Sequence, residues 1–68
     1  MELRVTINGE GRSLESPVSL RDLLRLLQLQ EDRVAIELNR KIIHREKWAE
    51  TCLQNDDRLE IVQFVGGG

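Results

Sequence analysis

Hydrophobic and polar residues alternate at the start of the chain, which is the pattern of a β-strand with one buried face. The apolar members of this pattern are Leu3, Val5 and Ile7. Asn8-Gly9 follows, and both residues tolerate the positive φ angles of a tight hairpin turn. We therefore predict a second strand over residues 12–15, paired with the first and ended by Pro17.

A helical spacing begins after Ser19. Four leucines recur at intervals of three and four residues and so line one face of an amphipathic helix. These residues are Leu20, Leu23, Leu24 and Leu27. Ser19 suits the N-cap, and Asp22 three residues later forms an imperfect capping box. Leu26 and Leu29 do not fit the stripe, so we expect them to close the helix end or to lie partly exposed.

Three further strands are predicted after this helix. They cover residues 34–38, residues 41–43 and a last segment that begins at Leu59. The chain between the last two is irregular, with one helical turn around residues 46–49. Val62 breaks the alternation of the last strand, which is typical of a strand covered on both sides or of one that frays.

The predicted order is strand, strand, helix, strand, strand, strand. A right-handed crossover makes the first and last strands neighbours in the sheet. The fold class is therefore α+β: a ubiquitin-like, or β-grasp, roll with about five short strands in a mixed sheet packed on one main helix. We place a single domain at residues 1–65 and a flexible glycine tail at residues 66–68.

Composition narrows the functional classes. The chain has 68 residues, is 40% hydrophobic and 32% charged, and carries a formal charge of −2, which suits a folded domain rather than a disordered one. Trp48 and Phe64 are the only aromatic residues, so little is available to stack on nucleic-acid bases. A local basic patch is conceivable at Arg40, Lys41, Arg45 and Lys47, although a solvated stretch is the more common interpretation. We expect no nucleic acid and no membrane as partners.

The reactive side chains inside the domain have simpler structural interpretations. Cys52 is the sole cysteine, so no disulfide within the chain can form, and we expect a cytoplasmic protein. We expect its thiol to be buried and inert rather than a sulfur acceptor. His44 has no partners at the spacing of a catalytic triad, Trp48 suits a lid over the core better than an anchor for a partner, and Asp56-Asp57 suits a turn. No metal site or catalytic residue is predicted.

The chain ends in Val65-Gly66-Gly67-Gly68. Consecutive glycines are costly to order and offer no side chain to pack, so they do not extend a strand well. Such an ending can thread a narrow enzyme channel that any Cβ would block, and it presents a carboxylate. A frayed terminus has the same composition, and composition alone leaves both interpretations open.

The ordered set of segments resembles the ThiS family of small sulfur carrier proteins of thiamine (thiazole) biosynthesis over essentially the whole chain. The segments that carry the resemblance are Asn8-Gly9, Asp22-Leu23-Leu24, Val34-Ala35-Ile36, Leu38-Asn39, Ile42-Ile43, Arg45, Trp48, the run from Asp57 to Val62, and the ending from Val65 to Gly68. The family often has Pro where this chain has His44, and Gly where it has Asp56. Both are turn positions, so the differences concern loop shape.

The resemblance implies that a ThiF-like adenylyltransferase uses MgATP to adenylate the Gly68 carboxylate. Sulfur from a cysteine desulfurase-type donor then gives a thiocarboxylate, which delivers sulfur to a ThiG-like thiazole synthase. Gly66 and Gly67 would thread the partner's channel, and Phe64 and Val65 would dock against it. The resemblance also implies that a hydrophobic face of the sheet near the last strand docks these enzymes. The protein would bind no cofactor and would be a covalent carrier and co-substrate rather than an enzyme.

Alternatives remain open at the level of residues, and a protein-conjugating modifier that uses the same tail chemistry is one of them. The small sulfur-carrier subunit of molybdopterin synthase shares this fold and ending, although that family is usually longer. A β-grasp binding or regulatory module that carries nothing would not need the glycine ending.

Overall fold

The computed structural model describes residues 1–64, which form a five-stranded mixed sheet, one α-helix and two 3₁₀ helices. The strands are β1 (Glu2–Ile7), β2 (Glu10–Glu15), β3 (Val34–Leu38), β4 (Lys41–Ile43) and β5 (Arg58–Gln63). The helices are α1 (Leu20–Leu26), η1 (Glu31–Arg33) and η2 (Arg45–Glu50). The strand order is β2-β1-β5-β3-β4, with β1 and β5 parallel and the other neighbours antiparallel. The predicted β-grasp roll is confirmed, including the neighbouring first and last strands.

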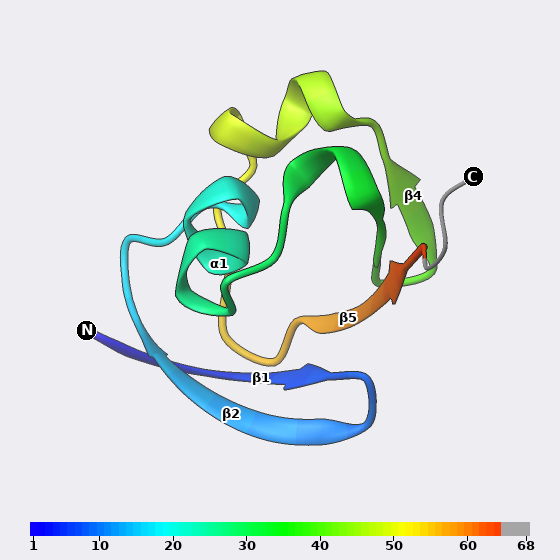
Figure 1. The fold of residues 1–68 in the computed structure, drawn as a ribbon. Helices are drawn as coiled ribbons and strands as arrows, with labels where there is room; N and C mark the ends of the chain where they lie inside the picture. The colour runs from blue at the N-terminus through cyan, green and yellow to red at the C-terminus, as the bar shows by residue number, and fades with distance from the viewer. Residues whose placement is uncertain (65–68) are drawn as a thin grey trace.

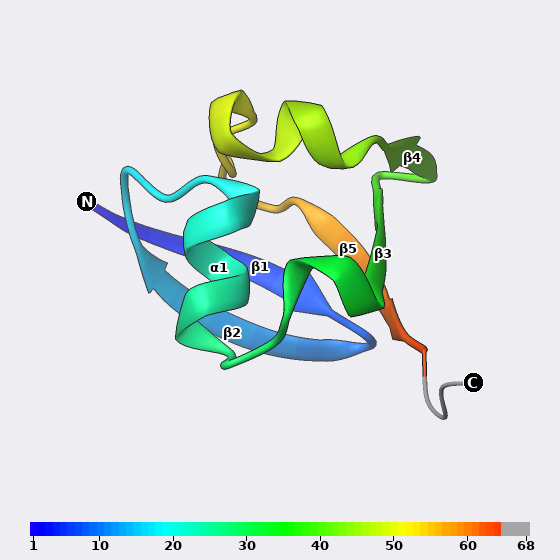
Figure 2. The same cartoon turned by 45° about the horizontal axis from the view of Figure 1, so that its top comes forward.

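The core lies between the sheet and the helices on one side of it. Figures 1 and 2 show α1 and η2 on the same side of the strands. The buried residues between these layers are mainly aliphatic: Leu3, Val5, Ile7, Val18, Leu20, Leu23, Leu24, Val34, Ile36, Trp48, Leu53, Leu59 and Ile61. Removing apolar surface from water is the main force that holds these layers together.

The other side of the sheet, called the open face below, carries no helix within residues 1–64. Its side chains come from the strand positions that alternate with the buried ones: Glu2, Arg4, Thr6, Ser13, Glu15, Ala35, Glu37, Ile42, Arg58, Glu60 and Val62. Antiparallel sheets commonly keep one such face in contact with solvent.

The first hairpin turns at Asn8-Gly9, as the sequence predicts. Ile7 pairs with Glu10, which leaves two residues in the turn. The φ angles are 50° at Asn8 and 85° at Gly9, as in the mirror-image turn whose twist matches a hairpin. Pairing therefore resumes directly after the turn, and β2 begins at Glu10 rather than at residue 12.

The helix begins with the predicted capping box. The hydroxyl of Ser19 accepts a hydrogen bond from the Asp22 N–H at 3.0 Å, and the Asp22 carboxylate accepts one from the Ser19 N–H at 3.0 Å. The bond from the Ser19 backbone favours the ionised carboxyl and so holds the pKa of Asp22 below its ordinary value of 3.8. Leu26, off the predicted stripe, is 65% exposed. In the described part of the chain no helix is long and apolar enough to cross a membrane.

The chain between α1 and β5 contains more helix than predicted. The sequence pattern does not reveal η1, because its three residues are all charged and none is buried. The predicted turn at 46–49 is the centre of the six-residue η2, in which Trp48 is the buried residue. The Trp48 indole N–H donates to the Ile43 carbonyl at 2.8 Å. Trp48 therefore closes the core beneath β4, as predicted, and is not available as an anchor for a partner.

One expectation about burial is wrong, and one of the two interpretations of Val62 is excluded. Cys52 is exposed rather than buried, because Leu53 beside it occupies the core position at 4% exposure. The backbone of Cys52 forms only an isolated β-bridge with Ser19. Val62 is 56% exposed, so β5 is not covered on both sides. Val62 lies on the open face, where no described helix packs.

Candidate functional site

Most of the predicted site lies beyond the part of the chain that the structure describes. Val65, Gly66, Gly67 and Gly68 fall outside residues 1–64, so the roles assigned to them stay predictions. Phe64 is the predicted site residue that is described, and its side chain is 58% exposed. The described part of the site consists of β5, which precedes this ending in the sequence, and of the surface around the end of β5.

β5 occupies the centre of the sheet, between β1 and β3. Its pairing with β3 runs from Leu38–Leu59 to Val34–Gln63, whereas its pairing with β1 covers only two positions. One edge of β5 is thus hydrogen-bonded to β3 along most of its length. On the other side it needs further partners, because a buried backbone group without a hydrogen bond is costly.

The side chain of Asn8 supplies those partners. Its amide oxygen accepts a hydrogen bond from the Ile61 N–H at 2.7 Å, and its amide nitrogen donates to the Ile61 carbonyl at 3.1 Å. The Asn8 backbone N–H also donates to the Leu59 carbonyl at 2.9 Å. The amide takes the place of a β1 residue at the point where β1 turns away into the hairpin.

A second asparagine holds the beginning of β5. The Asn39 amide oxygen accepts from the Arg58 N–H at 3.0 Å, and its amide nitrogen donates to the Asp57 carboxylate at 3.0 Å. The other Asp57 carboxylate oxygen accepts from the Gln54 N–H at 2.7 Å. These bonds confirm the predicted turn role of Asp57.

The end of β5 is tied to η1. The Phe64 N–H donates to the Arg33 carbonyl at 2.7 Å, one residue beyond the last strand position. With the two asparagines, this bond fixes β5 at its start, its middle and its end. The course of the chain is therefore set by hydrogen bonds to its backbone as far as Phe64.

The surface around the end of β5 carries exposed apolar side chains as well as charged ones. Three exposed hydrophobic side chains lie on β4, on β5 and at the end of β5: Ile42 at 70%, Val62 at 56% and Phe64 at 58% exposure. A small depression of about 140 Å³ is lined by Ala35, Ile36, Glu37, Ile42, Glu60 and Val62. Exposed apolar side chains that line one depression, as Ile42 and Val62 do, are typical of a contact surface for another protein.

The sequence names Phe64 and Val65 for docking and, through the resemblance, a hydrophobic face of the sheet near the last strand, but it does not single out Ile42 and Val62. Val62 could have been recognised from the alternation of β5. Leu59 and Ile61 face the core, so Val62 must face solvent, where an apolar residue is unexpected in a half-buried strand. Ile42 could not be recognised in this way, because β4 has only three residues.

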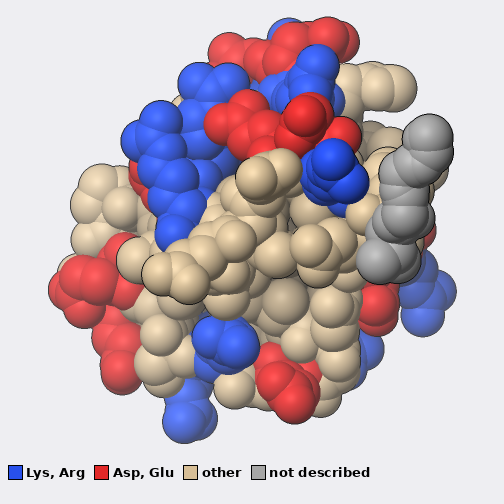
Figure 3. Space-filling model, in the orientation of Figure 1, with Lys and Arg blue, Asp and Glu red and all other residues tan. Residues whose placement is uncertain are grey.

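The remaining candidates form no second site within residues 1–64. His44 is exposed and directly precedes η2, without a side-chain capping bond. In the proposed basic patch, Lys47 pairs with Glu50 at 3.3 Å, as expected for a solvated stretch. Figure 3 shows basic and acidic side chains intermixed around one face of the molecule, with uncharged surface across its centre.

These observations define a class of protein: a small β-grasp domain whose central strand precedes a glycine ending in the sequence and carries exposed apolar side chains near its end. The ThiS family model matches residues 5–68, and the chain belongs to that family.

Three comparisons illustrate the relationship. The sulfur carrier protein ThiS of Bacillus subtilis is 44% identical over 50 residues, covering 74% of this chain and 76% of the relative. A crystal structure of the thiamine biosynthesis protein (ThiS) from Geobacter metallireducens is similar with a TM-score of 0.81 and 29% identity, covering 97% of this chain and all of the other. A thiazole synthase of Magnetococcus marinus is 35% identical over 97% of this chain, but this chain spans only 20% of its length.

Proposed function

We propose that this protein is a sulfur carrier in the formation of the thiazole ring of thiamine. The observation that carries the proposal is the match to the ThiS family model, which continues to residue 68 and so includes the glycine ending. The hold on β5 supports it, because a fixed β5 sets where the glycine ending begins relative to the surface that a partner binds.

The chemistry proposed for Gly68 has two steps. A ThiF-like adenylyltransferase uses MgATP to convert the carboxylate into an acyl-adenylate, with release of pyrophosphate, because a free carboxylate is a poor electrophile. In the second step, the terminal sulfur of a persulfide on a cysteine desulfurase-type donor displaces AMP to form an acyl disulfide, and a thiol reductant cleaves the S–S bond to leave the thiocarboxylate. The protein supplies a substrate group and no catalytic residue of its own.

We assign the apolar end of the open face, formed by Ile42, Val62 and Phe64, to docking of the partner enzymes. A ThiG-like thiazole synthase is the proposed recipient of the sulfur. The Magnetococcus marinus thiazole synthase supports this assignment, because a segment similar to this chain occurs within its polypeptide. No observation specifically favours the molybdopterin pathway.

Intact mass spectrometry tests the carrier chemistry. After incubation with adenylyltransferase, MgATP, a sulfur donor and a thiol reductant, we expect a mass increase equal to the exchange of one oxygen for one sulfur, located on Gly68. The Cys52→Ser variant should acquire the same sulfur, and a chain that lacks Gly68 should not. Since the Cys52 thiol is exposed, sulfur that appeared only when Cys52 was present would contradict the proposal.

A further inference from the structure

The open face holds two pairs of glutamates that lie directly opposite one another on neighbouring antiparallel strands. The pairs are Glu2–Glu15 on β1 and β2, and Glu37–Glu60 on β3 and β5. Residues opposite one another on one face have Cβ atoms about 4.5–5.5 Å apart, and like charges there repel. A cation beside either pair would therefore reduce the repulsion between its carboxylates.

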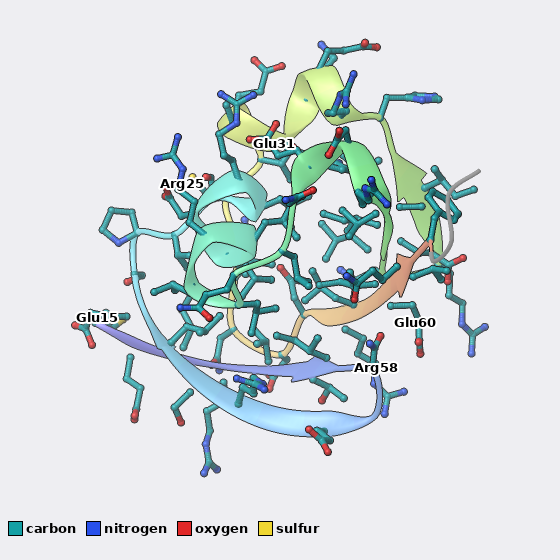
Figure 4. All side chains as sticks on the ribbon, viewed as in Figure 1. Glu15, Arg25, Glu31, Arg58 and Glu60 are labelled. Atoms are coloured by element: carbon teal, nitrogen blue, oxygen red, sulfur yellow. The ribbon has the colours of Figure 1, made fainter. Side chains whose placement is uncertain are left out.

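The first pair receives its cation from the chain itself. The Met1 ammonium lies 3.0 Å from a carboxylate oxygen of Glu15. Figure 4 shows Glu15 beside the start of β1. The repulsion between Glu2 and Glu15 is thus partly offset within the fold.

The second pair has no such cation. Neither Glu37 nor Glu60 forms an ion pair among residues 1–64, and residues 65–68 contain no basic side chain. Arg40 and Arg58 line a neighbouring depression together with both glutamates, but neither arginine pairs with them. Figure 4 shows Arg58 and Glu60 on the side of β5 that faces away from α1.

The surroundings of the second pair also differ. Glu37 and Glu60 line the small depression whose other walls include the exposed Ile42 and Val62. A partner that covers Ile42 and Val62 also removes water from the two carboxylates. Interface centres are depleted of charge, and burying two like charges without a counterion is strongly unfavourable.

We propose that a thiazole synthase docks on this surface and places a basic side chain, an arginine, between Glu37 and Glu60, with apolar side chains on Ile42 and Val62. Arginine suits the position because its planar guanidinium can donate to two carboxylates at once. This inference rests on the proposed function, and it adds the charge that the docking partner must carry. The synthase is the chosen occupant because a thiazole synthase contains a segment similar to this chain.

The test measures the affinity of the unmodified chain for a purified stand-alone thiazole synthase by calorimetry at low and high salt. Neutralising both residues, Glu37→Gln with Glu60→Gln, should weaken binding by about tenfold or more and flatten its salt dependence. The matched control neutralises the other cross-strand pair, Glu2→Gln with Glu15→Gln. It lies on the same face and removes the same charge, and it should change affinity by no more than about twofold.

Equal losses for both double variants would mean general charge attraction and would overturn the inference, as would no loss or no binding by the unaltered chain. The midpoint of thermal unfolding tests whether Arg40 or Arg58 already neutralises Glu37 and Glu60 within the fold. Removing repulsion should leave the midpoint of the Glu37/Glu60 double variant unchanged or raised. A lowered midpoint would mean that Arg40 or Arg58 already satisfies the pair. Acquisition of sulfur at Gly68 by the unaltered chain is scored separately, so a failed docking site and a failed carrier chemistry remain distinguishable.

Discussion

The two β-hairpins of this fold turn on the same residue type but are held in different ways. Asn8 and Asn39 each begin a two-residue turn with a φ of 50°, and each uses its side chain to grip β5. Gly9 follows the first, and Arg40, at a φ of 72°, follows the second. The left-handed region costs a residue with a Cβ, but costs glycine nothing comparable.

The two hairpins also differ in the length of their strands. The first hairpin pairs two strands of six residues, whereas β4 has only three and depends on the hydrogen bond from the Trp48 indole to Ile43. The second hairpin is also the one that exposes Ile42 at the proposed docking surface. A short edge strand that keeps an apolar residue in solvent must be stabilised by the layer beneath it, and η2 provides that support.

The largest effect is expected from Trp48→Ala, which should lower the free energy of unfolding by about 3–5 kcal/mol. The substitution leaves a cavity in the core and removes the hydrogen-bond donor of the Ile43 carbonyl. Leu14→Ala on the first hairpin should cost only about 1–2 kcal/mol, because Leu14 is half-buried. Urea unfolding followed by circular dichroism measures both. Similar losses would mean that the second hairpin does not depend on η2 as argued.

A smaller difference should separate the two turn asparagines. Asn8→Ala should lower the free energy of unfolding by about 2–3 kcal/mol, and Asn39→Ala by about 1 kcal/mol, because the Asn8 bonds to Ile61 are partly buried and those of Asn39 are exposed. Hydrogen exchange at the Ile61 amide should accelerate only in the first variant. The Asn8→Asp control keeps the acceptor but loses the donor, so an intermediate loss is expected. An unchanged Ile61 exchange rate in Asn8→Ala would show that the Asn8 side chain does not hold the Ile61 backbone.

The smallest effect concerns the second turn residue. Arg40→Gly should raise the free energy of unfolding by about 0.5–1 kcal/mol, since it relieves a left-handed conformation that glycine adopts freely. The reciprocal change Gly9→Ala should lower it by a similar amount. Thermal unfolding of the two variants measures the shifts. A loss of stability in Arg40→Gly would show that the arginine side chain contributes more than its backbone conformation costs.

Much of the fold could be predicted because its signals are local. The leucine spacing and the Ser19–Asp22 capping box define α1, and the Asn8-Gly9 pair defines the first turn, since neighbouring residues fix these geometries. The family was likewise recognisable from ordered short segments. The burial of Cys52 was predicted wrongly, because nothing local decides whether Cys52 or Leu53 faces the core.

The sequence by itself determined the element order, the β-grasp class and the glycine ending at Gly68, on which the proposed chemistry rests. Only the tertiary structure decided what holds β5 and what lies beside it: the asparagine hydrogen bonds to β5, the exposed Ile42 and Val62, and Glu37 directly opposite Glu60. The physical reason is that strand register joins residues far apart in the chain. The local periodicity of the sequence therefore does not predict a pairing such as Glu37 with Glu60.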